Sequence, residues 1–118
     1  MRRVVILGAG GKDFHVFLRL YRDDPNAHVV CFTATQIPGI DKRTFPASLA
    51  GPRYPNGIPI RPEADLERII REEKVNEVVF AYSDVSYDYV NERRKIAERN
   101  GAKFLLPDPK AVMVPSKR

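Results

Sequence analysis

A glycine-rich segment follows the first apolar run of the chain, and it reads Gly8-Ala9-Gly10-Gly11-Lys12-Asp13-Phe14. The first glycine permits a tight turn, and the next ones let the backbone approach a phosphate because no Cβ stands in the way. A helix that starts here would add free N–H groups and the positive end of its dipole. We therefore predict that these residues bind a phosphate or a nucleotide. The alternative is a strand–helix turn that needs glycine only for its geometry.

The segment departs from the dinucleotide fingerprint G-x-G-x-x-G, because Asp13 stands where the third glycine belongs. An acid in the first turn favours the helix dipole but opposes a pyrophosphate, which Lys12 could offset. It is also not a P-loop, because the chain contains no Gly-Lys-Ser or Gly-Lys-Thr. The chemistry expected here is anion binding without a metal–nucleotide cradle for phosphoryl transfer.

Polar residues also follow two other predicted strands. Thr33, Thr35 and Gln36 end one of them, where an NAD site would need an acid for the ribose hydroxyls. Their hydroxyl and amide groups can bind a ribose or a phosphate, or they only begin a hydrogen-bonded loop. After a later strand, the candidate ligand residues are Tyr82, Ser83, Asp84 and Ser86; Ser and Asp are equally suited to capping the next helix.

The remaining reactive side chains predict no catalytic or metal site. Cys31 lies in an apolar segment with no base beside it, which indicates a core residue. His15 is expected to be packed or to face solvent, and His28 opens a predicted strand, so no histidine pair forms. The charged run 92–95 is expected to face solvent.

The elements that must position these residues alternate between strand and helix. Strands are expected at 3–7, 27–33, 58–60, 76–82 and 103–106, and helices at 12–24, from 62, and from 84 or 86 to about 100. A long irregular loop is expected at 34–57, with Phe45, Leu49 and Tyr54 as a small satellite cluster, and a tail at 112–118. This pattern predicts an α/β fold: one Rossmann-like, three-layer domain with a parallel five-stranded sheet in the order 3-2-1-4-5. Ligands would bind where the order reverses, outside the carboxyl ends of strands 1 and 4.

The composition fits one globular domain of 118 residues, with 43% hydrophobic and 30% charged residues. A single cysteine favours a reducing, cytoplasmic setting. The formal charge of +5 suits an anionic ligand, while the lack of a basic stripe with aromatics argues against nucleic acid, and the short apolar runs argue against a membrane. The absence of Trp and the many charges are compatible with a thermophile.

Four long segments carry a family resemblance: VVILGAGGKDFHVFLR, VCFTATQIPGI, LAGPRYPNGIPI and VNEVVFAYSDVSYDYV. They resemble the N-terminal region of archaeal cyclic 2,3-diphosphoglycerate synthetases, some of whose relatives are described only as GTPases. The resemblance implies an ATP-dependent cyclase or ligase with a C-terminal P-loop domain that would bring Mg²⁺. It also implies that residues 1–118 are a fragment of that enzyme, inactive on their own.

Two alternatives stay open beside this resemblance. One is an NAD(P)- or CoA-binding domain of an oxidoreductase or ligase, and the other is a structural domain that binds no ligand and docks on a partner. A homo-oligomer is also possible.

Overall fold

The computed structural model describes residues 2–8, 12–34, 44–81, 86–106 and 114–115, with the backbone alone for residues 12, 13, 114 and 115. Its elements in chain order are β1 (Arg2–Leu7), α1 (Lys12–Leu20), β2 (Ala27–Ala34), β3 (Thr44–Phe45), α2 (Ala47–Ala50), β4 (Ile58–Pro62), a 3₁₀ turn (Glu63–Asp65), α3 (Leu66–Glu72), β5 (Glu77–Phe80), α4 (Tyr87–Arg99), β6 (Lys103–Leu106) and β7 (Val114–Pro115).

The described strands form one mixed sheet in the order β3-β4-β2-β1-β5-β6-β7. Within it, β4, β2, β1, β5 and β6 are parallel and follow the predicted order. The expectation of a purely parallel, five-stranded sheet is wrong, because β3 and β7 pair antiparallel with β4 and β6. Each added strand is two residues long, too short to give a periodic signal in the sequence.

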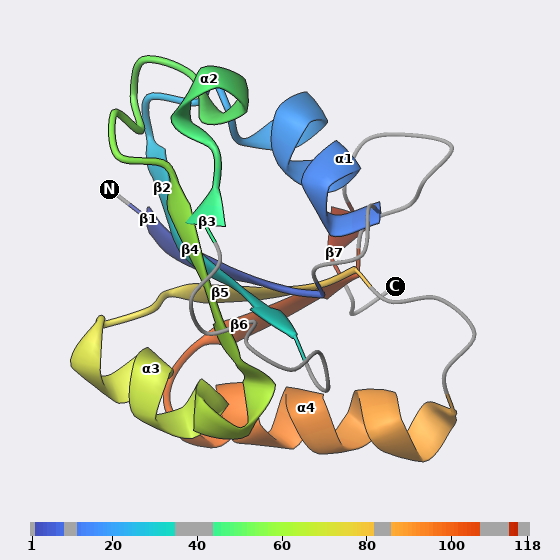
Figure 1. Ribbon diagram of the computed structural model, residues 1–118. Coiled ribbons are helices and arrows are strands. Elements are labelled where there is room, and N and C mark those ends of the chain that lie inside the picture. Colours follow the sequence, from blue (N-terminus) through green and yellow to red (C-terminus); the bar gives the residue numbers. More distant parts are fainter. Residues whose placement is uncertain (1, 9–11, 35–43, 82–85, 107–113, 116–118) are drawn as a thin grey trace.

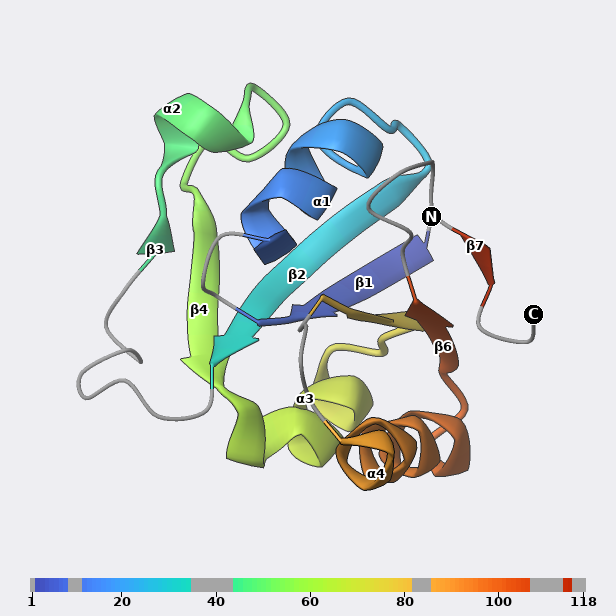
Figure 2. The same cartoon turned by 90° about the vertical axis from the view of Figure 1, so that its right-hand side faces the viewer.

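Helices cover both faces of the sheet, with α1 and α2 on one side and α3 and α4 on the other (Figure 1). The view turned by 90° shows the same layers, with β1 and β2 at the centre of the sheet (Figure 2). Each face has its own apolar cluster, and alternate residues of β1 enter them: Val4 and Ile6 on the α1 face, Val5 and Leu7 on the α3–α4 face. No helix in the described ranges has both the length and the apolar character needed to cross a membrane.

The predicted loop 34–57 is partly regular, so that expectation is wrong for its second half. Residues 44–50 form β3 and α2, and residues 35–43 lie outside the described part. The predicted satellite cluster does not form either. Phe45 and Tyr54 belong to the main core of the α1 face, whereas Leu49 is exposed.

Aromatic packing explains why this part of the chain is ordered. The ring of Phe45 lies 4.7 Å from Phe14, 5.6 Å from Phe17 and 5.4 Å from Phe32 between centroids. The Tyr54 ring contacts Phe17 at 5.4 Å, and its hydroxyl accepts a hydrogen bond from the Val29 N–H at 2.9 Å. Side chains of a long connection therefore close the core over α1 and β2.

Two further boundaries differ from the sequence expectation, and a third confirms one of its two alternatives. Helix α1 ends at Leu20 rather than residue 24, because the Arg22 N–H bonds to the Phe17 carbonyl, five residues back, which departs from the helical pattern of four. Helix α4 starts after Ser86, whose Oγ accepts the Tyr89 N–H at 3.1 Å, so Ser86 is the cap that the sequence placed at either Asp84 or Ser86. The predicted tail contains β7.

Candidate functional site

The glycine-rich segment 8–14, which we call the glycine turn, begins at the carboxyl end of β1, between β2 and β5, where the strand order reverses. Gly8 has a φ of 121°, a conformation that side-chain-bearing residues rarely adopt. Its N–H donates to the Thr33 carbonyl at 2.9 Å, and the Ala81 N–H donates to the Leu7 carbonyl at 3.1 Å. The first glycine is thus required by the backbone, at the point where an open α/β sheet binds ligands.

Helix α1 starts four residues after this glycine, at Lys12. Its first aromatic residue, Phe14, is half-buried and packs edge-on against Phe32, with 5.0 Å between ring centroids. Phe14 therefore anchors the start of α1 to β2. Its predicted role in ligand binding stays a prediction.

Many of the predicted site residues lie outside the described part of the chain. These are Ala9, Gly10, Gly11, Thr35, Gln36, Tyr82, Ser83 and Asp84, together with the side chains of Lys12 and Asp13. Gly8, Phe14, Thr33 and Ser86 are described, and all four lie near the carboxyl edge of the sheet.

Thr33, the penultimate residue of β2, is fully buried, and its hydroxyl donates to Glu63 Oε1 at 3.2 Å. Glu63 begins the 3₁₀ turn after β4, and its side chain is only 3% exposed. Its second oxygen, Oε2, accepts from the Tyr89 hydroxyl at 2.5 Å and from Arg93 Nε at 2.7 Å. We call Thr33, Glu63, Tyr89 and Arg93 the Glu63 cluster. A buried carboxylate needs such partners, since its desolvation otherwise costs several kcal/mol.

The electrostatics of the Glu63 cluster favour a neutral phenol and a charged guanidinium. Burial, and then the hydrogen bond to Glu63, raise the pKa of Tyr89. Burial lowers the pKa of Arg93, but its hydrogen bond and attraction to Glu63 outweigh this, so that pKa is above its ordinary value. The Arg93 guanidinium also stacks over the Tyr89 ring, 4.1 Å from its centroid.

Sequence reasoning missed Glu63, Tyr89 and Arg93, and it wrongly placed Arg93 on a solvent-facing run. The Arg93 side chain is 18% exposed. A usable signal in the sequence was the spacing of residues 89, 93 and 97, because positions i, i+4 and i+8 share one helix face. In the structure that face points inward, since Ala97 is fully buried.

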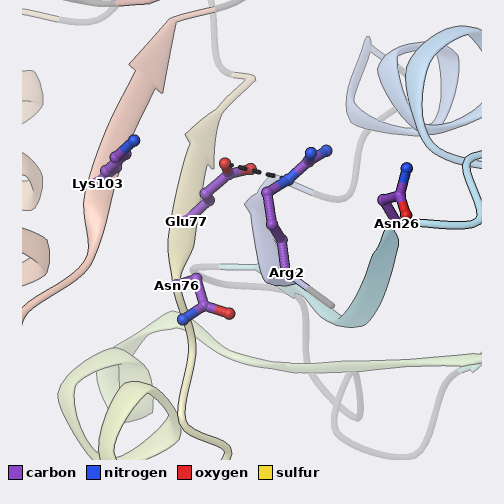
Figure 3. Close-up of a pocket in the computed structure, with 5 residues that line it drawn as sticks. All are labelled: Arg2, Asn26, Asn76, Glu77 and Lys103. Atoms are coloured by element: carbon purple, nitrogen blue, oxygen red, sulfur yellow. Dashed lines mark ion pairs between the residues drawn. The ribbon is translucent and has the colours of Figure 1, made fainter.

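A hollow of about 440 Å³ lies at the opposite, amino edge of the sheet (Figure 3). Its walls come from the starts of neighbouring strands and the residues just before them: Arg2, Asn26, Asn76, Glu77 and Lys103. Arg2 pairs with Glu77 at 3.2 Å and with Asp24 at 3.1 Å, so its charge is balanced within the protein. The amino ends of parallel strands are not where such sheets bind ligands, which makes this hollow a poor candidate.

The described side chains hold no group of three or more His, Cys, Asp or Glu that could bind a metal ion. Burial raises the pKa of Cys31 to about 12, so its thiol stays protonated and unreactive. Beside Gly8, the described part of the site contains a buried ion pair between Glu63 and Arg93.

No protein-family model matches the chain. A curated relative, arginine synthetase ArcE of the archaeon Thermococcus kodakarensis, is 52% identical over 117 residues. The match covers 99% of this chain but 26% of that protein, so the chain spans about a quarter of the relative's length. The chain thus corresponds to one domain of a larger archaeal protein.

Solved structures with the same fold are more distant in sequence. UDP-D-quinovosamine 4-dehydrogenase from Vibrio fischeri has a TM-score of 0.68 at 18% identity, covering 91% of this chain and 78% of that one. RSP, a Rex-family repressor in complex with β-NADH, has a TM-score of 0.62 at 15% identity, covering 98% and 49%. These likenesses establish a Rossmann-like α/β fold.

Proposed function

We propose that this chain is the nucleotide- or phosphate-binding domain of a larger archaeal synthetase that uses ATP. The observation that carries the proposal is the position of Gly8, a glycine with positive φ at the carboxyl end of the central strand β1, immediately before α1. The ligand's phosphate would lie against the backbone of the glycine turn and the start of α1. Side-chain contacts would come from the residues that the sequence predicts at the carboxyl ends of β2 and β5.

The relative from Thermococcus kodakarensis supports the synthetase part of the proposal, because it is named an arginine synthetase and is 52% identical in this region. The product of the whole protein is then arginine. The family resemblance of the sequence favours cyclic 2,3-diphosphoglycerate as the alternative product. In both versions, ATP cleavage and Mg²⁺ binding belong to a P-loop domain in the rest of the enzyme, and this domain alone has no activity.

Two assays on the full-length protein separate these products. With ATP and 2,3-diphosphoglycerate, ³¹P NMR would detect the cyclic diphosphate. With ATP, ammonium and a mixture of free amino acids that includes ureido amino acids, chromatography would detect arginine. Formation of either compound by the 118-residue chain alone would contradict the assignment of catalysis to the rest of the enzyme.

Ligand binding by the chain itself is tested by thermal shift and calorimetry with ATP, 2,3-diphosphoglycerate, arginine, NADH, NADPH and CoA. We expect ATP or 2,3-diphosphoglycerate to raise the melting temperature. A matched pair of variants separates binding from strain, because Gly8 and Gly101 both have positive φ, at 121° and 83°. Both alanine variants should lose stability, about 1 kcal/mol each, but only Gly8→Ala should lose affinity. Equal affinity in both variants would contradict a site at the glycine turn.

A second candidate is an NAD(P)- or CoA-binding domain of an oxidoreductase or ligase. It is favoured by Rossmann-like neighbours such as the repressor solved with β-NADH. Against it, Asp13 interrupts the dinucleotide fingerprint. The Glu63 carboxylate, which contacts Thr33 at the end of β2, already uses both oxygens within the protein, so it is not available for a ribose. A melting shift with NADH, NADPH or CoA alone would favour this candidate. No shift with any probe would favour a docking domain.

A further inference from the structure

A continuous series of hydrogen bonds runs from the glycine turn to α4. The Gly8 N–H donates to the Thr33 carbonyl at 2.9 Å, and the Thr33 hydroxyl donates to Glu63 Oε1 at 3.2 Å. The other oxygen of Glu63 accepts from Tyr89 at 2.5 Å and from Arg93 at 2.7 Å. One carboxylate thus joins the end of β2 to the first two turns of α4.

The hydrogen bonds of Glu63 lie at the edge of the sheet where the proposed ligand would bind. Glu63 follows β4 directly, so it sits at the carboxyl edge of the sheet. Helix α4 starts seven residues after β5 ends, so its N-terminal turns begin at the same edge. Gly8 and the start of α4 flank the position where the strand order reverses. Their separation therefore sets the width of any ligand site there.

Burial makes the arrangement selective for one geometry. With a side chain 3% exposed, Glu63 has little access to water, which could otherwise replace a misplaced partner. A shift of α4 would draw the Arg93 guanidinium and the Tyr89 hydroxyl away from a charged Glu63 oxygen at a low local dielectric. The carboxylate thus penalises movement of α4 relative to β2 far more than an exposed ion pair would.

We propose that Glu63 is a positioning residue for the phosphate or nucleotide bound at the glycine turn, holding α4 and Gly8 at the spacing that the ligand requires. The inference rests on the proposed function. Glu63 itself does not touch the ligand; it acts through Thr33 and through Tyr89 and Arg93.

The chain offers a matched control for this role. Glu67 also joins the α3 region to α4, through Arg99 at 3.0 Å and Asn100 at 3.0 Å, but one turn further along and with a 33% exposed side chain. These two partners lie at the C-terminal end of α4, away from the glycine turn, and a third partner, Arg71, lies on α3 itself. Glu63→Gln and Glu67→Gln therefore each remove one negative charge that contacts α4, the first from the 3₁₀ turn and the second from α3.

The experiment measures two quantities in wild type, Glu63→Gln and Glu67→Gln, at a temperature where all three are folded. The first is the amide resonance of Gly8 in ¹⁵N-labelled protein without ligand. The second is the affinity for ATP and for 2,3-diphosphoglycerate by calorimetry. We expect Glu63→Gln to shift the Gly8 resonance and to weaken binding about tenfold, and Glu67→Gln to change neither.

A second pair of variants keeps the test decisive if Glu63→Gln does not fold. Tyr89→Phe removes one hydrogen bond to Glu63, and Tyr87→Phe removes a hydroxyl from a side chain that is 72% exposed. Only Tyr89→Phe should move the Gly8 resonance and weaken binding.

The outcomes separate the two proposals. If wild type binds neither probe, the proposed nucleotide site fails and the positioning role fails with it. If wild type binds and Glu63→Gln binds equally well with an unmoved Gly8 resonance, only the positioning role is overturned. Equal effects of Glu63→Gln and Glu67→Gln would also overturn it, because they would indicate general loosening of α4.

Discussion

Two carboxylates join the α3 region to α4, and they do so in opposite ways. Glu63 is 3% exposed and pairs with Arg93, which is 18% exposed. Glu67 is 33% exposed and pairs with Arg99, which is 59% exposed. The first pair lies at the carboxyl edge of the sheet and the second at the far end of α4. Because water replaces lost partners only at the exposed pair, the same kind of bond fixes the geometry at one end and adds little at the other.

The largest expected effect is on stability when the buried carboxylate is removed. Glu63→Ala removes the buried carboxylate from the Arg93 guanidinium and leaves it only the exposed Glu92 carboxylate among the ion pairs of the described residues. We expect a loss of about 3 kcal/mol in the free energy of unfolding. Glu67→Ala should cost much less, since its partners face water. Urea denaturation followed by circular dichroism measures both. Similar losses in the two variants would remove the distinction between the pairs.

A smaller effect is expected from one hydrogen bond within the Glu63 cluster. Tyr89→Phe keeps the ring that stacks under Arg93 but removes the donor to Glu63, which should cost about 1.5 kcal/mol. Tyr87→Phe, on the exposed side of the same helix turn, should leave the unfolding midpoint unchanged. A cost below about 0.5 kcal/mol for Tyr89→Phe would mean that water or Arg93 fully compensates Glu63.

Cys31 reports whether the buried pair also controls local opening. Its thiol lies in the core of the α3–α4 face, with a pKa of about 12, so a thiol reagent should label it only when that face opens. We expect faster labelling in Glu63→Gln than in wild type under native conditions, and an unchanged rate in Glu67→Gln. Rapid labelling of native wild type would contradict the described burial.

The smallest expected effect is a change in stability at acid pH, and it comes from the exposed pair of Glu67 and Arg99. Hydrogen bonds from Arg99 and then Asn100 lower the pKa of Glu67 from 4.5 to about 2. A carboxyl with a lowered pKa stabilises the fold above its unfolded value, and that contribution disappears as the pH falls from 4.5 to about 2. Wild type should therefore lose more stability than Glu67→Gln over this window, and less so in high salt. Parallel acid titrations of the two proteins would detect the difference.

The parallel part of the fold could be predicted because its signals are local. Apolar runs, the glycine turn and the stop at Gly101 place each strand and helix, and the rules for right-handed crossovers then give the order of the five parallel strands. Strands β3 and β7 were not predicted, since a strand of two residues shows no periodic pattern in the sequence. Their place depends on contacts such as that of Phe45 with Phe14, which are distant in sequence.

For the candidate site, the sequence could predict the glycine at the end of β1 but not the buried side chains around it. Gly8 can be recognised from its residue type, because few other residues accept its φ of 121°. The Glu63 cluster does not, because its members come from β2, the turn after β4, and α4. Charged residues such as Glu63 and Arg93 are normally assigned to the surface, and only the three-dimensional contact that pairs them overrides that expectation.

The two short antiparallel strands have a consequence for how this domain can meet other chains. An exposed strand edge invites pairing with a foreign strand. Here β3 ends against Pro46, and β7 contains Pro115, a residue with no N–H to offer. Both margins of the sheet are thus poor templates for growth by strand addition. In the longer enzyme that we propose, contacts with the other domains are expected to use the helical faces or the ends of the strands. The domain should also resist self-association into fibrils.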